Sequence, residues 1–186
     1  FAPFTSSISD DDENEEDYPQ EALKNIDFFI HLQSLCLMLA PQLDPENFYA
    51  IFETLSDLTS LTSFTLKVCM NRVDTKGQNL KKTIAKFDKL KYLHLQLTLQ
   101  GGAKDTGKTL VSLAHFKALK HLKLEIFSRF GLDHPDIIKF VVAHKNLETL
   151  KFKVQHMRFD EYTELFEGIK KMRSLTNLCV LEREAF

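Results

Sequence analysis

One spacing recurs along the chain and constrains its fold more than any other feature. Leucine or another apolar residue stands at relative positions 0, 3, 5 and 7 of a short segment, and six copies of the segment begin at residues 32, 61, 90, 119, 147 and 175. The copies are Leu32/Leu35/Leu37/Leu39, Leu61/Phe64/Leu66/Val68, Leu90/Leu93/Leu95/Leu97, Leu119/Leu122/Leu124/Ile126, Leu147/Leu150/Phe152/Val154 and Leu175/Leu178/Val180, the last of which lacks its fourth apolar member because Glu182 stands there. Alternation at positions 3, 5 and 7 is typical of a strand with one buried face, so the pattern predicts six short strands.

A second apolar pattern precedes each strand. Counting back three, six and nine residues from position 0 gives mostly apolar residues, with Lys81 and His144 as the polar exceptions, and this spacing places them on one stripe of a helix. Residues that can cap such helices stand near the expected starts: Asp44, Asp105, Asp133 and Asp160. We therefore expect a helix before each strand and stacked strand–helix units.

A unit of 28 to 29 residues with an L-x-x-L-x-L strand and a full helix resembles the leucine-rich repeat, and its length resembles the ribonuclease-inhibitor-like class. The resemblance covers about residues 20–186. It implies an α/β solenoid, a right-handed β-α superhelix of about six repeats, with parallel strands on the concave face and helices on the convex face. Position 8 departs from the family's usual Asn or Cys, which is kept only as Cys69; the other copies have Ala40, Thr98, Phe127, Gln155 and Arg183. We therefore expect irregular turns.

Charge is distributed unevenly along the chain. Residues 10–17 include seven acids in eight positions, and residues 1–31 carry nine acids against one lysine, so the rest of the chain is +6 although the total is −2. Such a run cannot bury apolar area, so we expect residues 1–19 to be an acidic disordered or loop segment beside a leucine-rich-repeat domain of residues 20–186. The run could also mask the basic face of the chain or bind a basic partner.

The expected setting is intracellular, either cytoplasmic or nuclear. Cys36, Cys69 and Cys179 are widely separated and do not resemble the disulfide framework of a secreted domain. No apolar run approaches the roughly 18 residues of a membrane-spanning helix, so we expect no membrane partner. The first residues lack a leader and neither end has an obvious cap, so we expect a longer native chain or a partner that covers the ends.

One motif resembles a phosphate-binding loop. Gly102–Thr109 matches G-x-x-x-x-G-K-[ST], in which Lys108 would neutralise phosphate and Thr109 would ligate Mg²⁺. However, Gly107 and Gly77 stand 12 and 13 residues before position 0 of their copies, so the repeat already accounts for a glycine at a helix start. No later strand ends in the acid that would help to hold Mg²⁺. A P-loop nucleotide binder is therefore the weakest alternative.

A second segment, residues 43–55, faintly resembles the start of an F-box, a motif often joined to leucine-rich repeats in ubiquitin-ligase adaptors. Its Phe52, Leu55 and Leu58 occupy the same helix positions as residues in other copies. We therefore expect this helix to belong to the array, because it cannot also be a free docking domain.

The histidines and cysteines predict no catalytic or metal site. None stands in a C-x-x-C or H-E-x-x-H arrangement. His144 falls at a core helix position and should be a packed neutral imidazole, whereas His94 and His121 on neighbouring strands could approach each other without a third ligand. Cys36 and Cys179 should stand at opposite ends of the array. We expect no cofactor, no metal and no enzymatic activity.

Positions 2, 4 and 6 alternate with the buried residues and should face the concave side. The centre of that face is basic and carries an aromatic residue. The candidate partner-binding residues are Lys67, Tyr92, His94, Gln96, His121, Lys123, Glu125, Thr149, Lys151 and Lys153. Such a patch suits an acidic protein segment and suits a phosphate backbone less well.

The expected function is that of a non-catalytic protein–protein interaction module, or a scaffold subunit of a larger complex, that binds a partner through the concave strand face. The alternatives are a nucleic-acid-associated subunit of a ribonucleoprotein and the substrate-recognition part of a ubiquitin-ligase adaptor. Lysine without arginine or stacked aromatics argues against sequence-specific reading of nucleic acid.

Overall fold

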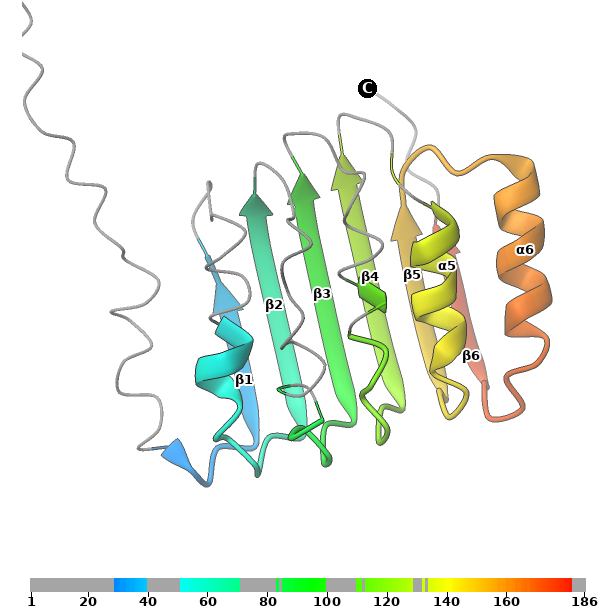
Figure 1. Cartoon of the computed structure of the whole chain (residues 1–186). Coiled ribbons are helices and arrows are strands. Elements are labelled where there is room, and N and C mark those ends of the chain that lie inside the picture. The colour runs from blue at the N-terminus through cyan, green and yellow to red at the C-terminus, as the bar shows by residue number, and fades with distance from the viewer. Residues whose placement is uncertain are drawn as a thin grey trace, which may run out of the picture.

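The computed structural model describes residues 29–39, 51–70, 83, 85–99, 110–111, 113–128, 132 and 134–181. A parallel sheet with strand order β1-β2-β3-β4-β5-β6 forms its centre (Figure 1). The strands are β1 (Ser34–Met38), β2 (Ser63–Met70), β3 (Tyr92–Leu99), β4 (His121–Ser128), β5 (Thr149–Val154) and β6 (Asn177–Leu181). Each strand starts two residues after position 0, so the prediction of six strands is confirmed.

Three helical segments lie on one face of this sheet (Figure 1). They are residues 51–55, α5 (His134–Ala143) and α6 (Phe159–Ile169). The opposite face carries no helix in the described part of the chain, and we call it the open face. This α/β layering is compatible with a solenoid-like arrangement.

The register of the sheet follows the spacing of the sequence copies. Ser34 pairs with Ser63, and the same position pairs across every junction as far as β6. An equivalent turn leads into each strand, because the N–H at position 0 donates to the carbonyl three residues earlier, from Leu32 to Phe29 (2.8 Å) through to Leu175 and Met172 (3.2 Å). The copies therefore share a backbone conformation as well as a sequence pattern.

Helices precede β2, β5 and β6 as predicted, whereas before β3 and β4 the structure describes only residues 83 and 110–111 as helical. Two details differ from the prediction. The residue three before position 0 lies in the turn after the helix, as His144 does after α5. Asp160 does not cap α6, because the helix already begins at Phe159, and the Arg158 N–H donates to the carboxylate of Glu161 at 2.7 Å. The candidate caps Asp44, Asp105 and Asp133 lie outside the described residues.

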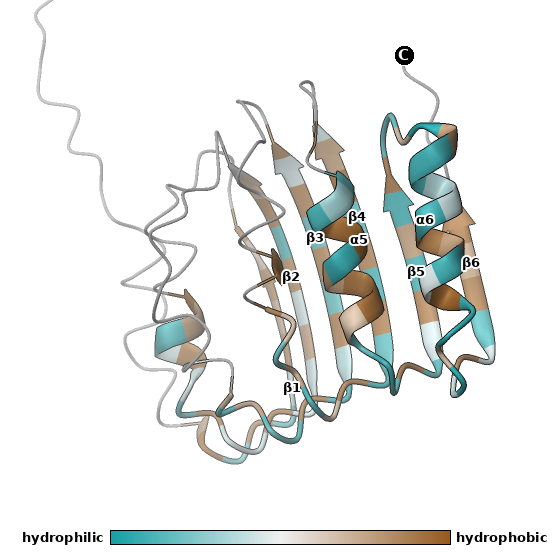
Figure 2. Ribbon diagram, turned by 45° about the vertical axis from the view of Figure 1, so that its right-hand side comes forward, coloured by the Kyte–Doolittle hydropathy of each residue, from teal (hydrophilic) through white to brown (hydrophobic). Residues whose placement is uncertain are grey.

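The core fills the space between the sheet and the helices. Most residues at positions 0, 3, 5 and 7 of the middle strands are at most 1% exposed, and Phe52 meets Phe64 of β2 edge to face at 5.8 Å. Figure 2 shows the alternation as bands of apolar and polar residues along the strands. The outer units are more open: Phe29, Phe166 and Leu178 are 59%, 41% and 44% exposed, although the pattern predicts that they are buried. No described strand or helix lies beyond them to cover these side chains.

At position 8, where most copies lack Asn or Cys, other contacts connect the ends of neighbouring strands. In β2, β3 and β4 the strand continues through this position, and Cys69, Thr98 and Phe127 lie opposite one another in register. At the next junction Gln155 stands at position 8, and its side-chain oxygen accepts the backbone N–H of Ser128 at 3.1 Å. Strand extension and the Gln155 amide thus connect these strand ends, at the position where the resemblance to leucine-rich repeats implies an asparagine.

Candidate binding site on the open face

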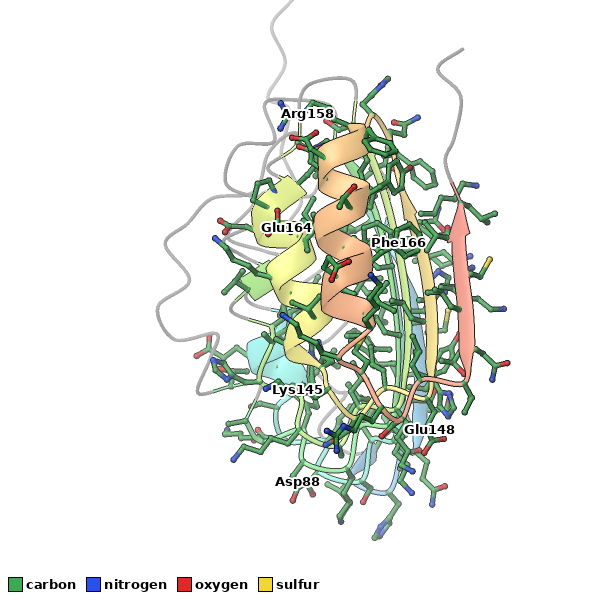
Figure 3. The ribbon with its side chains drawn as sticks, turned by 90° about the vertical axis from the view of Figure 1, so that its right-hand side faces the viewer. Asp88, Lys145, Glu148, Arg158, Glu164 and Phe166 are labelled. Atoms are coloured by element: carbon green, nitrogen blue, oxygen red, sulfur yellow. The ribbon has the colours of Figure 1, made fainter. Side chains whose placement is uncertain are left out.

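Side chains at positions 2, 4 and 6 form three rows across the open face, because strands in register align every second residue. The first row is Ser34, Ser63, Tyr92, His121, Thr149 and Asn177; the second is Cys36, Thr65, His94, Lys123, Lys151 and Cys179; the third is Met38, Lys67, Gln96, Glu125, Lys153 and Leu181. Figure 3 views the sheet along its edge, with helices on one side and strand side chains projecting from the other. All ten candidate partner-binding residues lie in the middle of these rows.

The lysines in the middle of the open face differ in the contacts that their ammonium groups make. Lys123 pairs with Glu125 of the same strand, with 3.0 Å between Nζ and Oε1. Lys153 reaches over the ring of Phe127, its Nζ 5.6 Å from the ring centre, which is a cation–π geometry. Lys151 is exposed and makes no ion pair with any residue that the structure describes. The open face therefore carries excess positive charge, centred on β4 and β5.

A hollow of about 340 Å³ lies over β3, β4 and β5. It is lined by Tyr92, His121, Leu122, Lys123, Thr149 and Lys151. The rings of Tyr92 and His121 stand side by side, with 6.4 Å between centroids and 40° between planes. The hollow thus combines two rings with the Thr149 hydroxyl and two ammonium groups.

His94 lies in the second row but is largely covered by its neighbours. It is 6% exposed, and its Nε2 has no hydrogen-bond partner in the described part of the protein. Burial lowers the pKa of His94, the Lys123 ammonium lowers it further, and Glu125 opposes these effects. At neutral pH the ring therefore adds no positive charge to the row.

The structure refines the expected approach of His94 and His121. The residue opposite His121 is Tyr92, and the residue opposite His94 is Lys123, so the two imidazoles are offset by one row. Within the described ranges no three His, Cys, Asp or Glu side chains gather where they could hold a metal ion.

The remaining motifs of the sequence fall elsewhere. The phosphate-loop match, Gly102–Thr109, lies outside the described residues, as do residues 43–50 of the F-box-like segment. Its continuation, residues 51–55, packs Phe52 and Leu55 into the core with no exposed surface. Cys36 and Cys179 lie on β1 and β6, at opposite edges of the sheet, as expected.

A buried polar cluster at the starts of α5 and α6 was not predicted from the sequence. The Nδ1 of His134 lies 3.0 Å from Oε2 of Glu161, and both side chains are 7% exposed. The other ring nitrogen lies 3.1 Å from the carbonyl oxygen of Gln155, and Glu161 also accepts the Arg158 N–H. These contacts fix the two helix starts against the end of β5. The Arg-x-x-Glu spacing could have signalled a capping box, but arginine is not a usual N-cap residue.

Comparison with protein-family models and with curated proteins finds no match for this chain. None of the helices that the structure describes is long and apolar enough to cross a membrane. The open face is therefore the feature from which a function can be inferred.

Proposed function

We propose that this chain is a leucine-rich-repeat solenoid of the ribonuclease-inhibitor-like class, and that it works as a non-catalytic interaction module or scaffold subunit. Its partner is another protein, bound on the open face, which is the concave face of the solenoid. One observation carries the proposal: six strands in register align three rows of mainly polar side chains on a face without a described helix.

The chemistry of that face favours holding a polypeptide. Neighbouring strands stand about 4.8 Å apart and alternate residues about 7 Å apart, so the rows offer contacts at peptide-like spacing. Gln96 and Thr149 can donate and accept hydrogen bonds, while Tyr92 offers an amphipathic ring. No disulfide joins the three cysteines, all of which the structure describes, and this supports an intracellular setting.

The test is a capture experiment with matched variants. One double variant, Lys123→Glu with Lys151→Glu, reverses charge on the open face. The control, Lys145→Glu with Lys171→Glu, makes the same change of net charge at exposed lysines that follow α5 and α6; Figure 3 labels Lys145. Circular dichroism and thermal unfolding establish that each variant is folded.

We expect proteins captured from cell extract, identified by mass spectrometry, to be lost with the open-face variant and kept with the control. Equal capture by both variants would contradict the proposed binding face. Loss of all captured material after nuclease treatment would instead support the nucleic-acid alternative.

A further inference from the structure

The second row places two like charges side by side. Lys123 and Lys151 are direct neighbours across the β4–β5 pair. Like charges directly opposite each other destabilise a sheet. The described structure relieves this only in part, because Glu125 contacts Lys123 and leaves Lys151 exposed and unpaired. The pair is better explained by a bound anion than by the needs of the fold.

The walls of the hollow restrict which anion can bind. Its volume, about 340 Å³, is near the lower end for ligand sites and has room for one or two side chains. The rings of Tyr92 and His121 give it an apolar side, while the ammonium groups of Lys123 and Lys151 lie on its polar side. A carboxylate on an aliphatic stem matches this division, with the stem against the rings and the charged group between the lysines.

The charge pattern around the hollow favours a peptide over a nucleic acid. Glu125, in the next row, places a negative charge 3.0 Å from the Lys123 ammonium. A nucleic acid carries a negative charge at every nucleotide, so Glu125 would repel its backbone where the backbone crossed the third row. A peptide can instead place acidic side chains only beside the lysines. Besides histidine, the described strands carry two aromatic residues on the open face, Tyr92 and Phe127, and Lys153 already lies over the Phe127 ring. Base stacking normally uses several free rings.

We propose that the hollow over β3, β4 and β5 receives a glutamate or aspartate side chain from an acidic segment of the partner, its carboxylate held between Lys123 and Lys151. This rests on the proposed function and adds the chemistry of the bound segment. The segment runs over the sheet as an extended chain, with apolar atoms of the anchoring residue against Tyr92 and His121.

The proposal can be tested with a display library of random 12-residue peptides, which take the place of the partner. The library is selected for binding to the immobilised full chain. We expect enrichment of peptides with an acid at one fixed position, and loss of that enrichment when selection is repeated on Lys151→Gln. Lys151→Arg should retain it because the charge is kept, and Lys145→Gln should not alter it.

A selected peptide is then synthesised with its anchoring acid and with the matching amide. Fluorescence anisotropy should give a Kd at least about tenfold weaker for the amide form, and Lys151→Gln should remove most of that difference. Equal affinity of the two forms, or selection of peptides without a fixed acid, would overturn the carboxylate proposal.

The pattern of failure separates the two proposals. If selected peptides lack the acid but still lose binding to Lys123→Glu with Lys151→Glu, the interaction module stands and the carboxylate anchor is wrong. If peptide binding does not depend on the open face at all, both are wrong. An oligothymidine that displaces the selected peptides at lower concentration than the peptide itself would also overturn the choice of a protein partner.

Discussion

His144 makes the stability of this protein depend on pH in a way that can be measured. It stands at a position where the other copies carry Phe, Leu or Met, and it is 4% exposed. Its Nδ1–H donates to the carbonyl of Phe140 at 2.9 Å, and its ring meets that of Phe140 edge to face at 5.0 Å. Burial lowers the pKa of His144 to about 4; the hydrogen bond to Phe140 opposes this effect, and the nearby His115 adds to it.

The sign and size of the effect follow from proton linkage. An unfolded histidine has a pKa of about 6.5, so between pH 6.5 and 4 the unfolded chain holds a proton at this site that the folded protein does not. The contribution of His144 to folding stability is therefore complete above about pH 6.5 and is lost as the pH falls, by about 1.4 kcal/mol per unit. Acidification from pH 6.5 to 5 should cost about 2 kcal/mol at this site alone.

Urea unfolding followed by circular dichroism at pH 7 and pH 5 measures this cost. The wild type is compared with His144→Phe, which installs the residue found at the same position in three other copies, as Phe29, Phe87 and Phe116. The variant should lose about 2 kcal/mol less than the wild type on acidification. At pH 7 it should be at least as stable, because it removes a buried Nε2 that lacks a partner within the described structure. His31→Gln, at an exposed histidine, serves as the control and should behave as wild type. If His144→Phe and the wild type lose the same free energy, His144 is not the source of the pH dependence and the linkage explanation is refuted.

Three further predictions concern the packing and are checked by urea unfolding. Gly168→Ala would place a Cβ 2.2 Å from Cγ1 of Val142, where α5 and α6 meet, and should lower the free energy of unfolding by about 1–3 kcal/mol. Adding Val142→Ala should restore part of this loss, whereas additive effects of the two substitutions would contradict the contact. Glu161→Gln should cost about 1–3 kcal/mol because a buried imidazole and a backbone N–H lose a carboxylate partner, and an unchanged stability would show that these contacts do not hold the cluster together. Leu95→Ala should cost about 2–5 kcal/mol, and the half-exposed Leu178→Ala clearly less; similar losses would mean that the end of the sheet is covered in solution.

The register of the sheet is predictable because two signals in the sequence agree. Copies 28 or 29 residues apart place the same pattern position on neighbouring strands, and the two-residue period of a strand then decides which side chains share a face. The rows through Lys67, Tyr92 and Lys151 follow from these two facts alone. Strand identity, order and face could therefore be derived without coordinates.

Features that depend on side-chain contacts could not be derived in this way. Alternation assigns His94 to the open face, but only the conformations of its neighbours decide that it is 6% exposed. The pair of His134 and Glu161 forms because two helix starts meet, and no local pattern connects them. The predicted capping by Asp160 failed because the helix begins one residue earlier, at Phe159, with Arg158 at the N-cap position.

The sequential strand order has a consequence for how the molecule opens. Each strand hydrogen-bonds only to its immediate neighbours in the chain, so β1 and β6 are each paired on one side only in the described structure. Local opening should begin at these edges and move inward one strand at a time, which gives backbone amides that exchange with solvent in a graded order. The hollow lies over β3, β4 and β5, inside both edge strands, and exchange should be slowest in β3 and β4. The binding surface can therefore keep its shape while the ends of the sheet fray.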